Sequence, residues 1–203
     1  MVFIVIEGLD GAGGETQTNL LLDYFNKIGK KAVKIESPNL NTPVGKAYRE
    51  YLYEKFEMKN EAIFLLCACD VIINRKTIEE NNEKGNIIIA DRYITSTIAY
   101  QAANKFPFEK ALKIVELIDF PKPDMIIYID ISPETSMRRK AKEKGNLDRH
   151  EKNLEYLKKV REFYKKEIDR NVLGKWFMVD GEQPIDKIHR DIVETIKNEL
   201  NLF

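Results

Sequence analysis

Short, continuous runs of apolar and mostly β-branched residues recur along the chain, and longer segments separate them. The runs cover residues 2–6, 31–35, 87–90, 125–129 and 177–179. Runs of this length without regular apolar–polar alternation are typical of strands that are buried on both faces. The pattern therefore predicts five strands in the interior of a sheet.

The segments between these runs have helical spacing, with their apolar residues on one face. They cover residues 18–28, 61–84, 108–118, 151–169 and 184–200. Strands that alternate with helices predict a parallel sheet with right-handed crossovers. No repeat or linker interrupts the pattern, so we expect a single α/β domain over residues 1–203. Residues 8–15 and the basic stretch 138–149 are predicted to be loops.

Composition and charge exclude several classes of protein. The 203 residues include 33 Lys and Arg and 33 Asp and Glu, and 43% of them are hydrophobic. This balance excludes a disordered chain and argues against a general nucleic-acid or membrane-surface binder. Cys67 and Cys69 have no second pair with which to form a disulfide framework or a zinc site. With no signal peptide and no membrane-length apolar run, we expect a cytoplasmic protein with reduced thiols.

A glycine-rich turn, residues 8–16, connects the first predicted strand to a helix. Such a turn points backbone N–H groups at a phosphate. The phosphate-loop motif G-x-x-x-x-G-K-[ST] fits at Gly8 and Gly13, but Gly14 stands in place of the Lys and Glu15 in place of Ser or Thr. A phosphate loop and a plain strand-to-helix turn both remain open on these residues alone.

Further motifs follow in order along nearly the whole chain. The opening Glu7-Gly8-x-Asp10-Gly11-x-Gly13 and the block Asp91-Arg92-Tyr93-x-x-Ser96-x-x-Ala99-Tyr100-Gln101 resemble the two signatures of thymidylate kinases. Weaker matches to the same family are Gly45-Lys46-Ala47-Tyr48-Arg49-Glu50, Pro123-Asp124, Tyr128-Ile129-Asp130, Pro133-Glu134, Asp148-Arg149-x-Glu151, Val160-Arg161-x-x-Tyr164 and Asp180. The chain therefore resembles a divergent member of the thymidylate kinase family.

The resemblance implies a fold and a reaction. The fold is the three-layer P-loop kinase type, with a central parallel five-stranded sheet and a basic lid at about residues 138–150. The reaction is transfer of the ATP γ-phosphoryl group to dTMP, giving dTDP, with Mg²⁺ as cofactor. Such a reaction needs positioning and charge neutralisation more than covalent chemistry. Family members are commonly homodimers that pack near residues 62–73, although an apolar helix face there could equally be core.

The resemblance also assigns roles to residues. Asp91 and Arg92 lie near Mg²⁺ and the acceptor, and the lid arginines Arg139 and Arg149 reach the transferred phosphoryl group. The expected metal ligands are Asp91 and Glu15. The ATP-binding residues are Gly8, Leu9, Asp10, Gly11, Ala12, Gly13, Gly14, Glu15 and Thr16. The substrate-binding residues are Asp10, Arg49, Cys67, Val71, Arg92, Thr97, Tyr100 and Gln101.

Each role has an ordinary structural alternative. Asp10 could be a turn residue, Arg49 a solvated helix residue, and Tyr100 a packing residue of its helix. The run from Arg138 to Lys144 has five bases and one acid. It could be a solvated helix face.

Three departures from the family pattern bear on activity. The loop lacks its cation at Gly14, and Glu15 adds a carboxylate beside any polyphosphate. Cys67 and Val71 stand where the family has an aromatic residue and an Arg that contact the base, and Arg75 is a candidate replacement for that Arg. These changes leave two alternatives: a non-catalytic paralogue that binds a nucleotide or a protein partner, and a small-molecule kinase with a changed acceptor.

Overall fold

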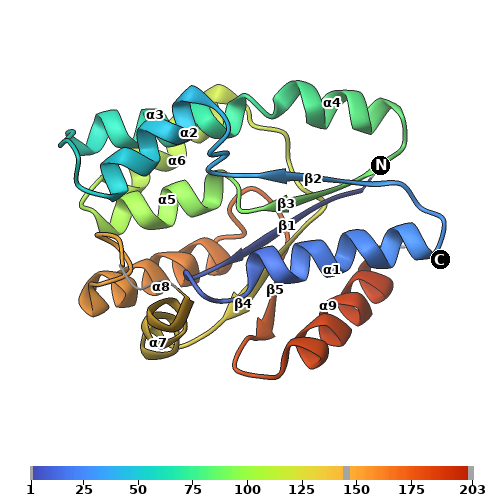
Figure 1. Cartoon of the computed structure of the whole chain (residues 1–203). Helices are drawn as coiled ribbons and strands as arrows, with labels where there is room; N and C mark the ends of the chain where they lie inside the picture. Colours follow the sequence, from blue (N-terminus) through green and yellow to red (C-terminus); the bar gives the residue numbers. More distant parts are fainter. Residues whose placement is uncertain (1, 144–146, 201–203) are drawn as a thin grey trace.

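The computed structural model describes residues 2–143 and 147–200, and its centre is a sheet of five parallel strands (Figure 1). The strands are β1 (Val2–Gly8), β2 (Ala32–Glu36), β3 (Ile87–Asp91), β4 (Met125–Asp130) and β5 (Trp176–Asp180), in the order β2-β3-β1-β4-β5. All five predicted strands and their parallel arrangement are confirmed. Every residue of β1 is buried, as the continuous apolar run predicts.

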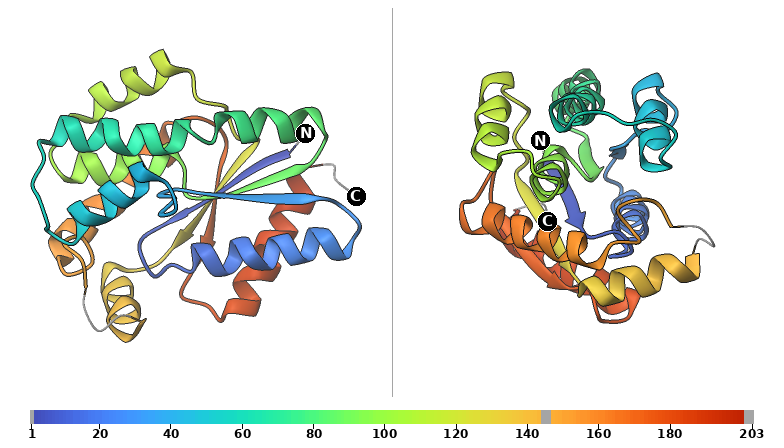
Figure 2. Two further views of the ribbon diagram at one scale, coloured as in Figure 1. Left: turned by 45° about the horizontal axis from the view of Figure 1, so that its top comes forward. Right: turned by 90° about the vertical axis from the view of Figure 1, so that its left-hand side faces the viewer.

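Helices cover both faces of this sheet and give three layers (Figure 2). The helices α1 (Gly14–Lys27) and α9 (Ile185–Glu199) pack on one face, and α5 (Ile94–Ala103) and α8 (Leu154–Asp169) pack together on the other. The helices α3 (Asn60–Ile72) and α6 (Phe108–Ile118) pack outside α5. No helix in the described ranges 2–143 and 147–200 is long and apolar enough to cross a membrane.

Residues 61–84 do not form the single helix that their spacing predicts. The helix α3 ends at Ile72, and α4 (Arg75–Glu83) begins after a turn. Polar side chains hold this turn: Asn74 donates to the carbonyl of Glu36 at 3.4 Å, and Arg75 donates to the carbonyls of Ile118 and Asp119 at 3.0 and 2.6 Å. These contacts join segments far apart in sequence, so local periodicity could not reveal the break.

Three described helices, α2 (Pro43–Leu52), α5 and α7 (Pro133–Glu143), lie outside the segments with helical spacing, and two of them have clear start signals. The helix α2 begins at Pro43, and the Thr42 hydroxyl accepts a hydrogen bond from the Gly45 N–H. The helix α7 also begins with Pro, and the Ser132 hydroxyl accepts from the Thr135 N–H. Both are standard helix starts. The prediction of a loop over 138–149 is therefore wrong for 138–143, and residues 144–146 of the predicted lid lie outside the described residues.

One core side chain opposes folding at neutral pH. Glu167 of α8 is completely buried, and neither carboxyl oxygen has a hydrogen-bond partner among the described residues. Burial, together with the nearby charge of Glu7, raises the pKa of Glu167 well above its usual value. The folded protein therefore keeps this proton over a pH range in which the unfolded chain releases it, so the free energy of unfolding falls as pH rises.

Replacing Glu167 by Gln should remove this pH-dependent loss of stability. We expect Glu167→Gln to gain stability relative to the wild type between pH 5 and pH 8, by at most about 1.4 kcal/mol per pH unit. Urea denaturation at several pH values measures this difference. A difference between the two proteins that does not change with pH would show that Glu167 is ionised in the folded state.

Candidate functional site

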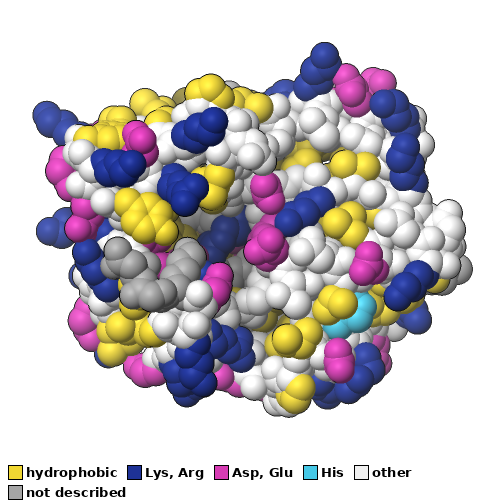
Figure 3. Space-filling model, in the orientation of Figure 1, with side chains coloured by type: hydrophobic (Ala, Val, Ile, Leu, Met, Phe, Trp, Pro, Cys, Tyr) yellow, Lys and Arg dark blue, Asp and Glu magenta, His cyan; other side chains and the backbone are white. Residues whose placement is uncertain are grey.

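Two neighbouring cavities open at the carboxyl ends of the strands. The larger, called here the central cavity, has a volume of about 350 Å³ and lies among α2, α3, α5 and the segment before α8. Its lining includes all eight of the predicted substrate-binding residues: Asp10, Arg49, Cys67, Val71, Arg92, Thr97, Tyr100 and Gln101. A space-filling view shows a hollow near the centre of this face with charged side chains around it (Figure 3).

The second cavity, called here the loop cavity, has a volume of about 280 Å³ and lies over the glycine-rich turn. All nine predicted ATP-binding residues from Gly8 to Thr16 line it, together with Asp91. Asp10, Arg92 and Lys140 line both cavities and therefore form the wall that the two share. Groups bound in the two cavities would meet at this wall.

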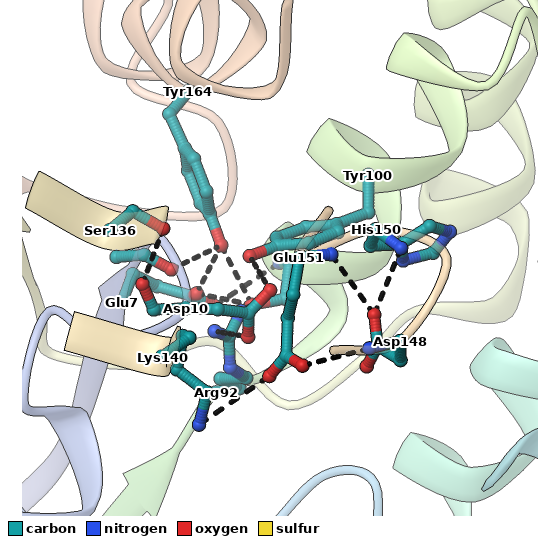
Figure 4. Close-up of polar contacts among 12 residues, drawn as sticks. Glu7, Asp10, Arg92, Tyr100, Ser136, Lys140, Asp148, His150, Glu151 and Tyr164 are labelled. Carbon is teal, nitrogen blue, oxygen red and sulfur yellow. Dashed lines mark hydrogen bonds and ion pairs between the residues drawn. The ribbon is translucent and has the colours of Figure 1, made fainter. Parts of the chain in front are cut away.

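The wall is built on a buried carboxylate at the end of β1. Glu7 is 1% exposed and accepts hydrogen bonds from the backbone N–H groups of Tyr93 and Ser96, at 3.0 and 3.2 Å. The hydroxyls of Thr95, Ser96 and Tyr164 also donate to it (Figure 4). Glu7 thereby satisfies the N–H groups at the start of α5, where a negative charge is also favoured by the helix dipole.

Asp10 orients the guanidinium of Arg92 in this wall. Its Oδ1 accepts from Arg92 at 2.8 Å, and its Oδ2 accepts from the Tyr100 hydroxyl at 2.9 Å. Burial opposes ionisation of Asp10, but the charge of Arg92 and the Tyr100 hydrogen bond outweigh it, so the pKa of Asp10 lies below its usual value. Arg92 has a φ of 67°, a strained conformation for a residue with a side chain. Backbone strain of this kind concentrates at functional sites.

Asp91 and Glu15 place two carboxylates at the loop cavity. Burial raises the pKa of Asp91 to about 6, the charges of Arg92 and Lys34 lower it in part, and that of Glu15 raises it further. A cation between the two carboxylates would relieve their repulsion. Mg²⁺ is commonly held by one or two carboxylates together with substrate phosphates, so this pair fits it. Among the described residues, no group of three or more acidic, His or Cys side chains could hold a metal alone.

A side chain at Gly14 would compete for space with the carboxylate of Asp91. A Cβ placed on Gly14 would lie 2.9 Å from Oδ1 of Asp91, closer than real contacts allow. The Asp91 carboxylate therefore occupies the space into which a loop lysine would begin to project.

The lid arginines lie away from both cavities. Arg139 donates to the carbonyls of Gly11 and Gly181, at 3.1 and 2.9 Å, and so ties the glycine-rich turn to the end of β5. Arg149 forms a fork on Glu57 at 3.0 and 2.8 Å, and its guanidinium lies 3.9 Å from the ring centroid of Tyr51. Neither lines the central or the loop cavity, although Arg139 bonds the turn that does, and their contact with the transferred phosphoryl group stays a prediction.

The expected replacement for the base-contacting Arg also lies elsewhere. Arg75 bonds the carboxyl-terminal carbonyls of α6 and lines neither cavity. Beside Cys67, the central cavity has an aromatic side chain, Tyr48 of α2. Burial and the charge of Asp70 raise the pKa of the Cys67 thiol, and a hydrogen bond with Tyr48 offsets this in part. The thiol therefore stays protonated and packs as a small apolar group.

Several lining residues were missed in the sequence, including Tyr48, Lys140 and His150. The His150 ring stacks on Tyr156 at 4.6 Å, and burial lowers the pKa of His150 to about 4. It is therefore neutral at physiological pH. Lys140 was missed because its segment was interpreted as a loop. As a helix, positions 136, 139, 140 and 143 share one face, and Ser136 on that face donates to the carbonyl of Asp10 at 2.6 Å.

Comparisons with known proteins agree on one family. A family model described as thymidylate kinase matches residues 6–192. A protein named thymidylate kinase from Sulfurihydrogenibium sp. (strain YO3AOP1) is 36% identical over 200 residues, with 96% of each chain covered. A probable thymidylate kinase from Pyrococcus abyssi is 33% identical over 98% of this chain and 97% of its own. A thymidylate kinase from Dictyostelium discoideum is 31% identical over 98% of this chain and 86% of its own.

The raised pKa of Asp91 makes a prediction about divalent cations. Below about pH 6 Asp91 is protonated and cannot ligate a cation, so Mg²⁺-dependent nucleotide binding should weaken as pH falls from 7 to 5. Calorimetry with ATP, with and without Mg²⁺, measures the contribution of the cation at each pH. Asp91→Asn should remove most of this contribution at pH 7 and leave it independent of pH over the same range. An unchanged Mg²⁺ contribution in Asp91→Asn would exclude Asp91 as a ligand.

Proposed function

Because the chain belongs to the thymidylate kinase family, we propose that it transfers the γ-phosphoryl group of ATP to dTMP, with the donor in the loop cavity and the acceptor in the central cavity. One observation carries this assignment of cavities. The eight residues matched to acceptor binding come from separate segments of the chain, and all of them line one cavity. That cavity shares a wall with the cavity over the glycine-rich turn.

The shared wall suits the reacting groups. An oxygen of the acceptor phosphate attacks the γ-phosphorus, and the bond from that phosphorus to the β–γ bridging oxygen breaks, releasing ADP. Arg92, held at its fixed angle by Asp10, and Arg49 from α2 carry the charges that bind the acceptor phosphate. Asp10 has lone pairs left to accept from the sugar hydroxyl, and the Tyr100 ring limits space around the sugar.

The base end of the central cavity supports a pyrimidine acceptor. Both amide atoms of Gln101 are buried and have no hydrogen-bond partner among the described residues. A carboxamide offers one donor and one acceptor, which complement the edge of thymine. Thr97 from the same helix lies beside it in the lining, while Cys67 and Val71 supply the apolar part.

Asp91 and Glu15 would hold Mg²⁺ when the donor nucleotide is bound. Mg²⁺ held there would supply positive charge that offsets the charge of the donor phosphates. The protein contributes two carboxylates at the loop cavity, and the absence of a side chain at Gly14 leaves room for that of Asp91.

A second candidate function is a non-catalytic paralogue that binds a nucleotide or a protein partner. The replacement of the loop cation by Gly14, followed by Glu15, favours it. On this alternative, ATP with Mg²⁺ would not be turned over with any monophosphate.

We expect turnover of dTMP above background in a coupled assay of ADP release, and slower turnover of the other nucleoside monophosphates. Arg49 is exposed, so Arg49→Met should leave the fold intact and raise the KM for dTMP about 10- to 100-fold through the loss of one charged contact. Lys46→Met is the matched control, because Lys46 lies on the same helix and lines neither cavity. No turnover with any monophosphate would leave the paralogue as the remaining function.

We also propose that the protein is a cytoplasmic homodimer that packs through α3. Leu65 on this helix and Ile73 directly after it are 55% and 48% exposed, and Cys69 is exposed between them. Apolar side chains that gather on one helix face are typical of a protein interface.

Sedimentation should therefore give about twice the chain mass of 23.7 kDa. Leu65→Glu should shift the protein to the monomer, since it places a charge in the contact. Leu117→Glu, on the 85% exposed Leu117 of α6, serves as control. A monomeric wild type at micromolar concentration would rule out this interface.

A further inference from the structure

The loop cavity is poor in positive charge. Residues 1–26 contain no Lys or Arg. Among the described residues that line the cavity, acids outnumber bases, and the basic ones are Arg92 and Lys140. Arg92 is already in an ion pair with Asp10 at 2.8 Å. A polyphosphate in this cavity would therefore meet two described cations, Arg92 and Lys140, each already paired with a carboxylate.

Lys140 reaches this position from α7. Its residue is 9% exposed, and its ammonium lies 2.7 Å from Glu143 and 3.5 Å from Glu151 (Figure 4). Its stem passes over Gly11, where a Cβ would lie 3.4 Å from Lys140 Cδ. Gly11 has a φ of +76°, so the turn brings backbone alone under the lysine stem.

A side chain at Gly14 would have to displace the Asp91 carboxylate. Any side chain at Gly14 would begin 2.9 Å from the Asp91 carboxylate, which the proposed reaction needs at the metal. The loop supplies no cation of its own, and α7 places a lysine on the wall between donor and acceptor.

We propose that Lys140 supplies from α7 the positive charge on the transferred phosphoryl group that the glycine-rich turn lacks. This inference rests on the proposed function. Its ammonium has three donors, so it can retain Glu151 and exchange the more exposed Glu143, whose side chain is 59% exposed, for a phosphoryl oxygen. Negative charge spread over the transferring oxygens strengthens this contact during the reaction.

The test compares Lys140→Met and Lys140→Arg with the wild type. Calorimetry gives the ratio of the affinities for ATP and AMP in the presence of Mg²⁺, and single-turnover kinetics gives the transfer rate to dTMP. Lys140→Met should lower the ATP-to-AMP affinity ratio about 10-fold or more, because AMP lacks the outer phosphates. It should slow transfer about 10²- to 10³-fold. Lys140→Arg should retain more of both.

Lys158→Met is the matched control, since Lys158 pairs with Glu155 at 2.8 Å on α8 and lines neither cavity. It should behave like the wild type. If Lys140→Met is less stable because Glu151 is left buried without this partner, Lys140→Met/Glu151→Gln replaces it in both measurements.

The ratio of the affinities for ATP and AMP tests the role of Lys140 even if the protein shows no turnover. A wild type that does not phosphorylate dTMP sinks the proposed function alone, whereas a lowered ATP-to-AMP ratio in Lys140→Met still supports the phosphate contact. An unchanged affinity ratio, with wild-type transfer where transfer is seen, would overturn the role of Lys140.

Discussion

The buried Glu7 carboxylate is the interaction on which the site depends. It lies at the end of β1 and accepts hydrogen bonds from the first turn of α5 and from Tyr164 of α8. A buried charge is stable only when its lone pairs are satisfied, so the strand and the two helices must meet in this arrangement. Arg92, with its φ of 67°, directly precedes the backbone N–H of Tyr93 that Glu7 holds. The hydrogen bonds that pack α5 against β1 therefore also fix the position of Arg92.

Charge in the site is divided between elements in an unusual way. The glycine-rich turn and the end of β3 carry acid, through Glu15 and Asp91, while positive charge comes from Arg92 and Lys140. The net charge of zero over the whole chain conceals this division. A divalent cation suits the acidic side of the cavity and a phosphate suits the basic side. Gly14 and Glu15 are therefore compatible with a working site, provided that Arg92, Lys140 and a divalent cation together supply the positive charge that a bound polyphosphate needs.

Much of this could be predicted from the sequence, because the signals are local. Five continuous apolar runs predicted the five strands, and the two motif blocks, with the weaker matches around Arg49 and Asp70, supplied many of the residues that line the two cavities. The failures concern contacts between distant segments. Asn74 and Arg75 end a helix by bonding to residues about 40 positions away, and Arg139 is held by Gly181. Lys140 was overlooked for a related reason, since its role follows from the helix face it shares with Ser136.

The wall shared by the two cavities also bears on competition with water. Asp10, Arg92 and Lys140 are charged side chains already joined to neighbours by ion pairs, so the partition between the cavities stands without a bound acceptor. On the proposed reaction, the donor phosphate faces this partition before dTMP arrives. Hydrolysis of ATP requires a water molecule in line with the bond that breaks, and in the proposed reaction the acceptor oxygen takes that same position. Occupation of the central cavity by the acceptor, and not the paired side chains alone, would therefore keep water from the donor phosphate.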